Sequence, residues 1–287
     1  MLAIFKREFK SYFINVTGYI FIGVLFVFCG IFTMAVNLMG ASTSFAIVLN
    51  NLNIILMIII PVLTMKSMAE EKRSKTDQLL YSLPIKTMNV VIGKYLAMVA
   101  VFGLACLGMA FVPVILGFFG EIPYGATYAA LLGFFMLGSA LIAICMFISS
   151  LTSIQIVAAV LGIAVSFALY LMSGLVSLIP TTAGWSLACF IVLAIVIGVI
   201  IGLLTKNYYI GLIAGCVCAI PAIIVKIVKS ELLEGLFPRL VAYLAVFDRF
   251  TTLAGGIFDL TAIVYYLSVI VFFVFLSYQS MDKRRWA

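Results

Sequence analysis

The chain contains no histidine, and only 9% of its 287 residues are charged. Haem ligation by histidine, typical zinc sites and histidine proton relays are therefore excluded. The cysteines lie within or beside apolar stretches, as small buried hydrophobes do and as a disulfide framework does not. They are Cys29, Cys106, Cys145, Cys189, Cys216 and Cys218. Residues two apart on a helix do not share a face, so Cys216 and Cys218 make a poor chelate for a soft metal. We expect no metal and no cofactor in this chain.

The motifs of common catalytic and nucleotide-binding sites are also missing. Gly93-Lys94 has neither the upstream glycine nor the following hydroxyl of a phosphate-binding loop. No G-x-S-x-G occurs, and H-E-x-x-H is impossible without histidine. We therefore expect a chain that is not an enzyme and does not hydrolyse ATP by itself.

Acidic residues are absent from the centres of the long apolar stretches. Aspartate or glutamate at such depth would indicate proton or ion coupling. This absence argues against a secondary transporter or channel that is not powered by ATP. We keep that class of protein as an alternative.

What the chain has in abundance is apolar sequence. It is 66% hydrophobic, and its mean hydropathy is +1.33, which predicts an integral membrane protein. Stretches long enough to cross a bilayer as helices lie at about 17–38, 45–65, 95–117, 127–149, 154–178, 185–205, 208–228 and 262–280. The predicted fold is an all-α polytopic bundle of about eight transmembrane helices, in a single transmembrane domain over 1–287. Because only Lys206-Asn207 separates the sixth and seventh stretches, six spans with a re-entrant pair are the alternative.

Basic residues cluster at the ends of these stretches, which argues against nucleic acid as the partner of a chain with net charge +7. With the N-terminus inside, thirteen lysines and arginines are cytoplasmic and four are external. The positive-inside rule thus predicts that both termini are cytoplasmic. We expect a multi-pass protein of a bacterial plasma membrane.

Residues 1–16 predict a helix that lies on the membrane surface. Phe5 and Phe9 recur at helical spacing, whereas Lys6, Arg7 and Lys10 fall on the other side. Such a helix places its aromatic face among lipid headgroups and its basic face toward anionic lipid. A simple basic flank of the first span is the alternative.

Between the second and third spans lies a charged segment, 66–94. It holds nine charged side chains, so it has to remain in water. Glu70 and Arg73 are helical neighbours, as are Glu71 and Lys75, and Pro84 ends the predicted helix. Leu79 and Leu80 form a short apolar edge that would suit docking on a soluble protein. A solvated helix with no partner is equally compatible with this pattern.

The outer segment 229–260 predicts short amphipathic helices before the last span. Leu240, Leu244 and Phe247 repeat at helical spacing, and Phe250 follows one turn later. These four residues are candidates for an outer gate. A packed external loop is the alternative.

The charged segment resembles the cytoplasmic signature of ABC-2-type transporter permeases, approximately E-E-[KR]-[KR]-S-G-T-x-E-x-L-L-x-x-x-P followed by G-K-[YF]-L. The matching residues are Glu70, Glu71, Lys72, Arg73, Ser74, Thr76, Leu79, Leu80, Pro84, Gly93, Lys94, Tyr95 and Leu96. Lys75 and Gln78 depart from the pattern. The tail resembles the gliding-motility-type branch, through Phe247, Phe250, Gly255, Asp259, Tyr265, Tyr266, Ser268, Arg284, Arg285 and Trp286.

This resemblance implies a permease subunit of an exporter that pairs with a second permease subunit, identical or different. Two separate ATPase subunits, which carry the ATP and magnesium, would dock beneath the pair. The charged segment would be the coupling helix. Its expected contacts with the ATPase are Glu70, Glu71, Arg73, Thr76, Leu79, Leu80 and Pro84.

Overall fold

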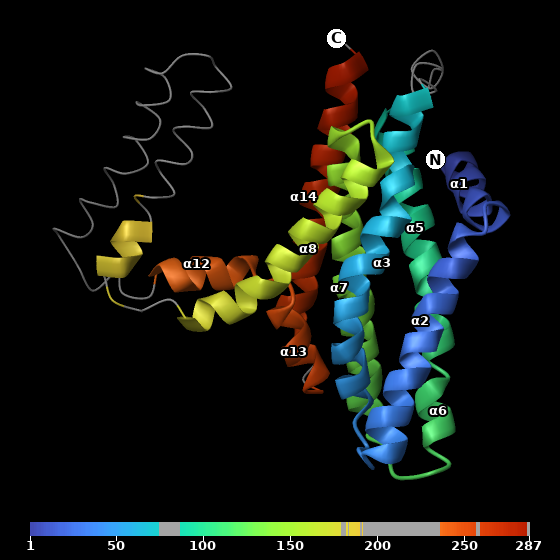
Figure 1. The fold of residues 1–287 in the computed structure, drawn as a ribbon, viewed down its shortest axis with the longest axis vertical. Helices are drawn as coiled ribbons and strands as arrows, with labels where there is room; N and C mark the ends of the chain where they lie inside the picture. Colours follow the sequence, from blue (N-terminus) through green and yellow to red (C-terminus); the bar gives the residue numbers. More distant parts are fainter. Residues whose placement is uncertain are drawn as a thin grey trace. The chain divides into compact units, whose positions relative to one another are not determined.

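The computed structural model describes residues 1–74, 87–178, 182, 184–189, 191, 236–256 and 259–285. All regular elements within these ranges are helical, which confirms the all-α class (Figure 1). In chain order they are α1 (Leu2–Ile14), α2 (Thr17–Thr33), the π-helix η1 (Met34–Met39), α3 (Phe45–Ser74), α5 (Thr87–Met109), α6 (Val112–Leu116), α7 (Tyr124–Leu151), α8 (Gln155–Leu178), α12 (Leu236–Leu244), α13 (Asp248–Ala254) and α14 (Leu260–Arg285).

Membrane-spanning helices account for most of these elements. Six are long and apolar enough to cross a bilayer: Thr17–Met39, Phe45–Ser74, Thr87–Leu116, Tyr124–Leu151, Gln155–Met172 and Leu260–Lys283. A helix provides hydrogen bonds for its own backbone N–H and C=O groups, and the hydrocarbon of the bilayer offers none. These six coincide with six of the eight predicted spans. The other two, at 185–205 and 208–228, lie almost entirely outside the described residues.

The chain divides into two compact units, Met1–Ala168 with Val246–Ala287, and Leu169–Ala245. The single domain over 1–287 stays a prediction. In the first unit α7 is the central helix, with 78% of its most apolar window buried, and α3, α5 and α14 pack around it. Small residues allow this close packing. Gly138 of α7 faces the ring of Phe102 on α5, and a methyl group there would overlap that ring.

Helix α1 exists where the interfacial helix was predicted, and it packs along α5 and α2 (Figure 1). Ile4 is buried in this contact. It lies against Gly93 of α5, where an added Cβ would come within 3.1 Å of Ile4 Cγ2. The helix therefore has a protein-facing side, which the aromatic pattern alone did not predict.

The charged segment differs from the prediction at both of its edges. Helix α3 continues to Ser74 and α5 already begins at Thr87, so residues 66–74 and 87–94 are helical extensions of spans and not a loop. The charges mark where these helices leave the bilayer, and they do not end the helices. Residues 75–86 lie outside the described part of the chain.

Two short helices, α12 and α13, occupy the predicted outer segment. Two of the outer-gate candidates, Phe247 and Phe250, are buried in the first unit, at 4% and 0% exposed. Their role as a gate stays a prediction. Phe250 packs on Phe134 of α7, with ring centroids 6.4 Å apart. Leu244 is exposed, and the side chain of Leu240 is outside the described set. An amphipathic pattern shows that a helix has an apolar face, but it does not show whether core or lipid covers that face.

Candidate coupling site

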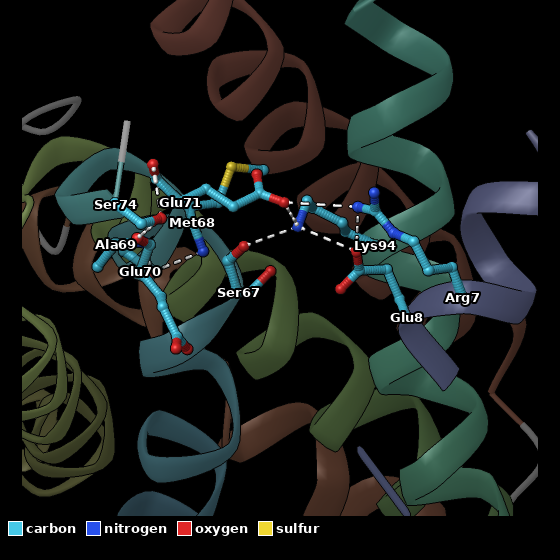
Figure 2. A network of polar contacts seen from close by, with 10 residues as sticks. Arg7, Glu8, Ser67, Met68, Ala69, Glu70, Glu71, Ser74 and Lys94 are labelled. Atoms are coloured by element: carbon cyan, nitrogen blue, oxygen red, sulfur yellow. Dashed lines mark hydrogen bonds and ion pairs between the residues drawn. The ribbon is translucent and has the colours of Figure 1, made fainter. Parts of the chain in front are cut away.

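A buried lysine organises the end of the bundle where α1, α3 and α5 meet. Lys94 is the single charged residue of α5, and its side chain is 2% exposed. Its ammonium nitrogen lies 2.7 Å from Glu71 Oε1 on α3 and 3.4 Å from Glu8 Oε1 on α1. It also donates a hydrogen bond of 2.9 Å to the backbone carbonyl of Ser67 (Figure 2). A buried ammonium is costly unless it is paired and hydrogen-bonded, and here both conditions are met.

A second cation completes the cluster. Arg7 donates to Glu8 Oε1 at 2.7 Å and lies 3.6 Å from Glu71 Oε1 (Figure 2). The hydrogen bond to Glu8 is the largest reason why the pKa of Arg7 is raised. Two cations and two carboxylates make the cluster electrically neutral. It joins three helices whose members are far apart in sequence, and we refer to Arg7, Glu8, Glu71 and Lys94 as the charge cluster.

The residues on either side of Lys94 hold α5 to different helices. Gly93 permits the close approach of α1 at Ile4. Tyr95 donates a hydrogen bond of 3.2 Å to the carbonyl of Ser139 on α7. The triplet Gly93-Lys94-Tyr95 therefore connects α5 with α1, α3 and α7. These contacts explain why a glycine, a lysine and a tyrosine follow one another here.

The same end of α3 is fastened to α7 by a serine. Ser149 Oγ donates to the carbonyl of Met65 at 3.2 Å and accepts from the backbone nitrogen of Ala69 at 3.2 Å. A hydroxyl placed against a helix backbone in this way fixes both position and rotation.

The end of α7 receives donors from two neighbours. Lys72 of α3 donates to the carbonyl of Ser150, and Ser280 of α14 donates to the same oxygen at 3.1 Å. The last carbonyls of a helix have no partner within it, so these side chains cap α7.

The residues predicted to contact the ATPase do not all lie on one face of α3. Glu70 and Arg73 are exposed on the last turn of α3. Glu71 instead faces α5 and α1, with its side chain 17% exposed. Its expected role as a direct contact with the ATPase stays a prediction, and within the chain Glu71 forms an ion pair with Lys94. Thr76, Leu79, Leu80 and Pro84 lie outside the described residues.

The residues predicted for the interfacial helix also differ in their surroundings. Lys6 and Lys10 are exposed, and the rings of Phe5 and Phe9 stack with centroids 5.8 Å apart. Arg7, predicted on the lipid-facing basic side, is 57% exposed and also pairs with Glu8 and Glu71. Its proximity to acidic residues of another helix could not be read from α1 alone.

Glu8 and Lys94 were missed as site residues. The usable signal was Lys94 itself, a lone charge at the eighth residue of a predominantly apolar helix that begins at Thr87. Such a charge in a membrane protein usually has a partner. Which partner it has depends on the packing of α1, and the sequence pattern does not give that packing.

Comparison with known proteins places the chain in a family. The family model described as ABC-2 family transporter protein matches residues 19–213, which is more than half of the chain. No curated protein and no solved structure matches the chain. The match leaves the gliding-motility branch a prediction. Membership implies a membrane subunit rather than the ATPase, with ABC ATPases as partners in general. The chain therefore belongs to the ABC-2 family of transporter proteins and is the membrane permease of an ABC-type transporter.

Proposed function

We propose that this permease is the transmembrane subunit of an exporter in which the last turn of α3 receives the movement of a separate ATPase. One observation carries the proposal. The exposed Glu70 and Arg73 are on the same turn of α3 as Glu71 and Lys72, which bind other helices of the bundle. A partner that contacts the exposed pair would therefore act on a helix end with firm internal connections.

The arrangement follows from helical periodicity. Residues three apart share a face, so Glu70 and Arg73 point in one direction. Glu71 points toward α5 and α1, where it meets Lys94 and Arg7. Lys72 points toward α7, where it meets Ser150. A displacement of the exposed face would be transmitted to both groups of helices at once.

Several finer features belong to the same proposal. Two ATPase subunits, each holding ATP and magnesium, would serve a pair of permease chains. The basic ends of the helices support a cytoplasmic location for this end of the bundle and for both termini. The membrane would be a bacterial plasma membrane, and the family resemblance of the tail supports the gliding-motility branch.

The test is charge reversal on the exposed pair. The chain would be reconstituted in vesicles with candidate ABC ATPase subunits from the same host, and ATP hydrolysis would be measured with and without the permease. We expect Glu70→Lys combined with Arg73→Glu to reduce the permease-dependent hydrolysis about tenfold, because like charges across an interface are strongly unfavourable. The melting temperature should stay within about 1 °C of the parent, since exposed charges contribute little to stability.

Lys6→Glu is the matched control, because Lys6 is an exposed charge on α1 near the same end. Hydrolysis unchanged by the α3 reversal, or reduced equally by Lys6→Glu, would contradict the proposal. Transport that persists without ATP under an imposed ion gradient would favour the secondary-transporter alternative.

A further inference from the structure

A cavity lies at the end of the first unit that is opposite to the charge cluster. Helix α3 reaches the charge cluster in its last turns, whereas the cavity is lined by residues just before its first residue, Phe45. Helix α6 lies at the same end of this unit (Figure 1). The volume of the cavity is about 340 Å³, which is within the roughly 300–1,000 Å³ of small-molecule sites. Its lining includes the polar residues Asn37, Ser42 and Thr43 and the apolar residues Leu116, Phe119 and Ile122.

The polar wall contains an acceptor that has no donor among the described residues. Asn37 belongs to the π-helix η1, a rare geometry that is frequent at functional sites. Its Nδ2 donates a hydrogen bond of 2.6 Å to the carbonyl of Ser42, which fixes which of the two amide atoms is the nitrogen. Its Oδ1 is buried and has no hydrogen-bond partner in the described part of the chain. Because such an acceptor is costly to bury, a ligand that brings a donor to Asn37 would gain that cost back.

The segments that form the cavity favour a positive charge. Residues 11–65 and 95–205 contain no lysine or arginine, and Glu121 is the single charged residue in these two ranges. It lies between Gly120 and Ile122, which both line the cavity. The span Thr17–Met39 also ends here, and the C-terminal end of a helix is the negative end of its dipole. An anion would find no basic partner on these segments, whereas a cation would find a carboxylate and a helix C-terminus.

An apolar surface continues from the cavity. Phe119 lines the cavity and is 76% exposed, and the neighbouring Phe118 is 85% exposed. Ile115 on α6 is exposed as well. Since the span Thr17–Met39 ends at the cavity, these side chains lie near the boundary between hydrocarbon and water. A ligand can thus hold a polar head in the cavity and an apolar chain along this surface, and an aromatic ring beside a cation adds to the attraction.

We propose that this cavity binds a small cationic amphiphile, an alkylammonium ion whose head donates to Asn37 and whose chain lies along Phe119. An ammonium group has three donors and one positive charge, so it matches both the free acceptor and the negative surroundings. An alcohol supplies a donor but gains nothing from Glu121. The ammonium of an ethanolamine phospholipid comes with a phosphate, which would lie near Glu121 without a basic partner. The site therefore selects a free alkylammonium ion, and this inference does not depend on coupling to an ATPase.

Photoaffinity labelling of the full chain tests the site. The chain would be placed in phosphatidylcholine nanodiscs with a dodecylammonium probe that carries a diazirine in its chain, and the adducts would be mapped by mass spectrometry. We expect adducts within residues 34–43 and 115–122. A dodecanol probe of the same length should label these segments about tenfold less, because charge-assisted hydrogen bonds are the stronger ones. Unlabelled dodecylammonium should compete with the probe, whereas phosphatidylethanolamine in the nanodisc should not.

A blocking variant shows whether the cavity itself holds the probe. A Cβ at Gly120 would meet nothing within 4 Å, so Gly120→Leu can fill the cavity without a clash at the backbone. Gly30→Leu is the matched control, because a Cβ at Gly30 on α2 also meets nothing within 4 Å and Gly30 does not line the cavity. Labelling should fall about tenfold in Gly120→Leu and stay unchanged in Gly30→Leu.

Two polar variants test the chemistry of recognition. Asn37→Leu should weaken the affinity for the probe about three- to tenfold, because it removes the acceptor. Glu121→Gln should weaken it about two- to threefold, a smaller effect because Glu121 is exposed. Glu70→Gln removes an exposed carboxylate at the other end of the unit and should leave the affinity unchanged. The melting temperature of each variant checks its folding.

Four outcomes would overturn the proposal. They are equal labelling by the dodecanol probe, competition by phosphatidylethanolamine, undiminished labelling of Gly120→Leu, and adducts that lie outside the two segments. Competition by phosphatidylethanolamine would identify a phospholipid site instead. If Gly120→Leu does not fold, Asn37→Leu and Glu121→Gln decide, and unchanged affinity in both would overturn the proposal. The measurements need neither ATP nor an ATPase, so failure here is distinguishable from failure of the proposed function.

Discussion

Replacement of Lys94 by methionine tests whether the charge cluster holds α1, α3 and α5 together. The substitution preserves a long apolar stem but removes ion pairs at 2.7 and 3.4 Å and a hydrogen bond at 2.9 Å. Two carboxylates then face one cation. Breaking a fully buried ion pair costs about 3–5 kcal/mol. Because the Glu8 and Glu71 side chains are each 17% exposed and can recruit water, we expect about 2–4 kcal/mol here.

The assay is thermal unfolding of the detergent-solubilised full chain. At about 2–4 °C per kcal/mol for chains of this size, Lys94→Met should lower the melting temperature by roughly 5–15 °C. Lys6→Met serves as the control, because it removes a lysine that is exposed on α1. It should shift the melting temperature by about 1 °C or less.

A double substitution separates charge balance from lost packing. Lys94→Met leaves the cluster with one excess negative charge, and Glu71→Gln leaves it with one excess positive charge. The two together leave Arg7 paired with Glu8 at 2.7 Å and restore neutrality. The double variant should therefore lose about 1–3 kcal/mol less unfolding free energy than the two single variants lose together. Additive effects, or a Lys94→Met variant as stable as Lys6→Met, would refute the cluster as a structural link.

The other predictions concern packing inside the same bundle. Gly138→Ala should destabilise the chain by about 1–3 kcal/mol, because its methyl group would overlap the fully buried ring of Phe102. Gly108→Ala is the matched control, since the added methyl meets the ring of Phe26, which is 42% exposed and can rotate outward; equal losses in melting temperature for the two would contradict this reasoning. Ser149→Ala should cost about 1–2 kcal/mol through its lost hydrogen bonds to the α3 backbone, measured by the same unfolding assay, and an unchanged melting temperature would show that these bonds contribute nothing.

The membrane spans could be predicted from the sequence because the bilayer imposes a simple rule. A stretch of about 20 apolar residues has few alternatives to a helix in hydrocarbon, where backbone groups find no water. The span predicted at 127–149 appears as α7, Tyr124–Leu151, with only its ends shifted. The end of α3 was missed for a related reason. Hydropathy locates where a helix leaves the bilayer, whereas the helix itself continues for as long as its residues favour it.

The site was harder to predict, because its contacts join segments that no local pattern relates. Glu71 was identified within a charged run, but its orientation toward Lys94 depends on the packing of α3 against α5. Phe250 was placed on an amphipathic helix, yet the ring of Phe134 covers it. Periodicity gives the face on which a residue lies. It does not give the neighbour of that face.

Three consecutive residues in the last turn of α3 have different surroundings, because they point in different directions. Glu70 is exposed, Glu71 binds α5 and α1, and Lys72 binds α7. Since adjacent positions on a helix are about 100° apart, no rotation of this turn can change one contact and preserve the other two. A partner that moved the exposed face would have to carry α5 and α7 with it or break two charge-assisted contacts. Charge-assisted hydrogen bonds are the strong ones, so the helices are expected to move together. Under the proposed function, the rigidity of this turn is therefore what would convert a local contact into movement of the bundle.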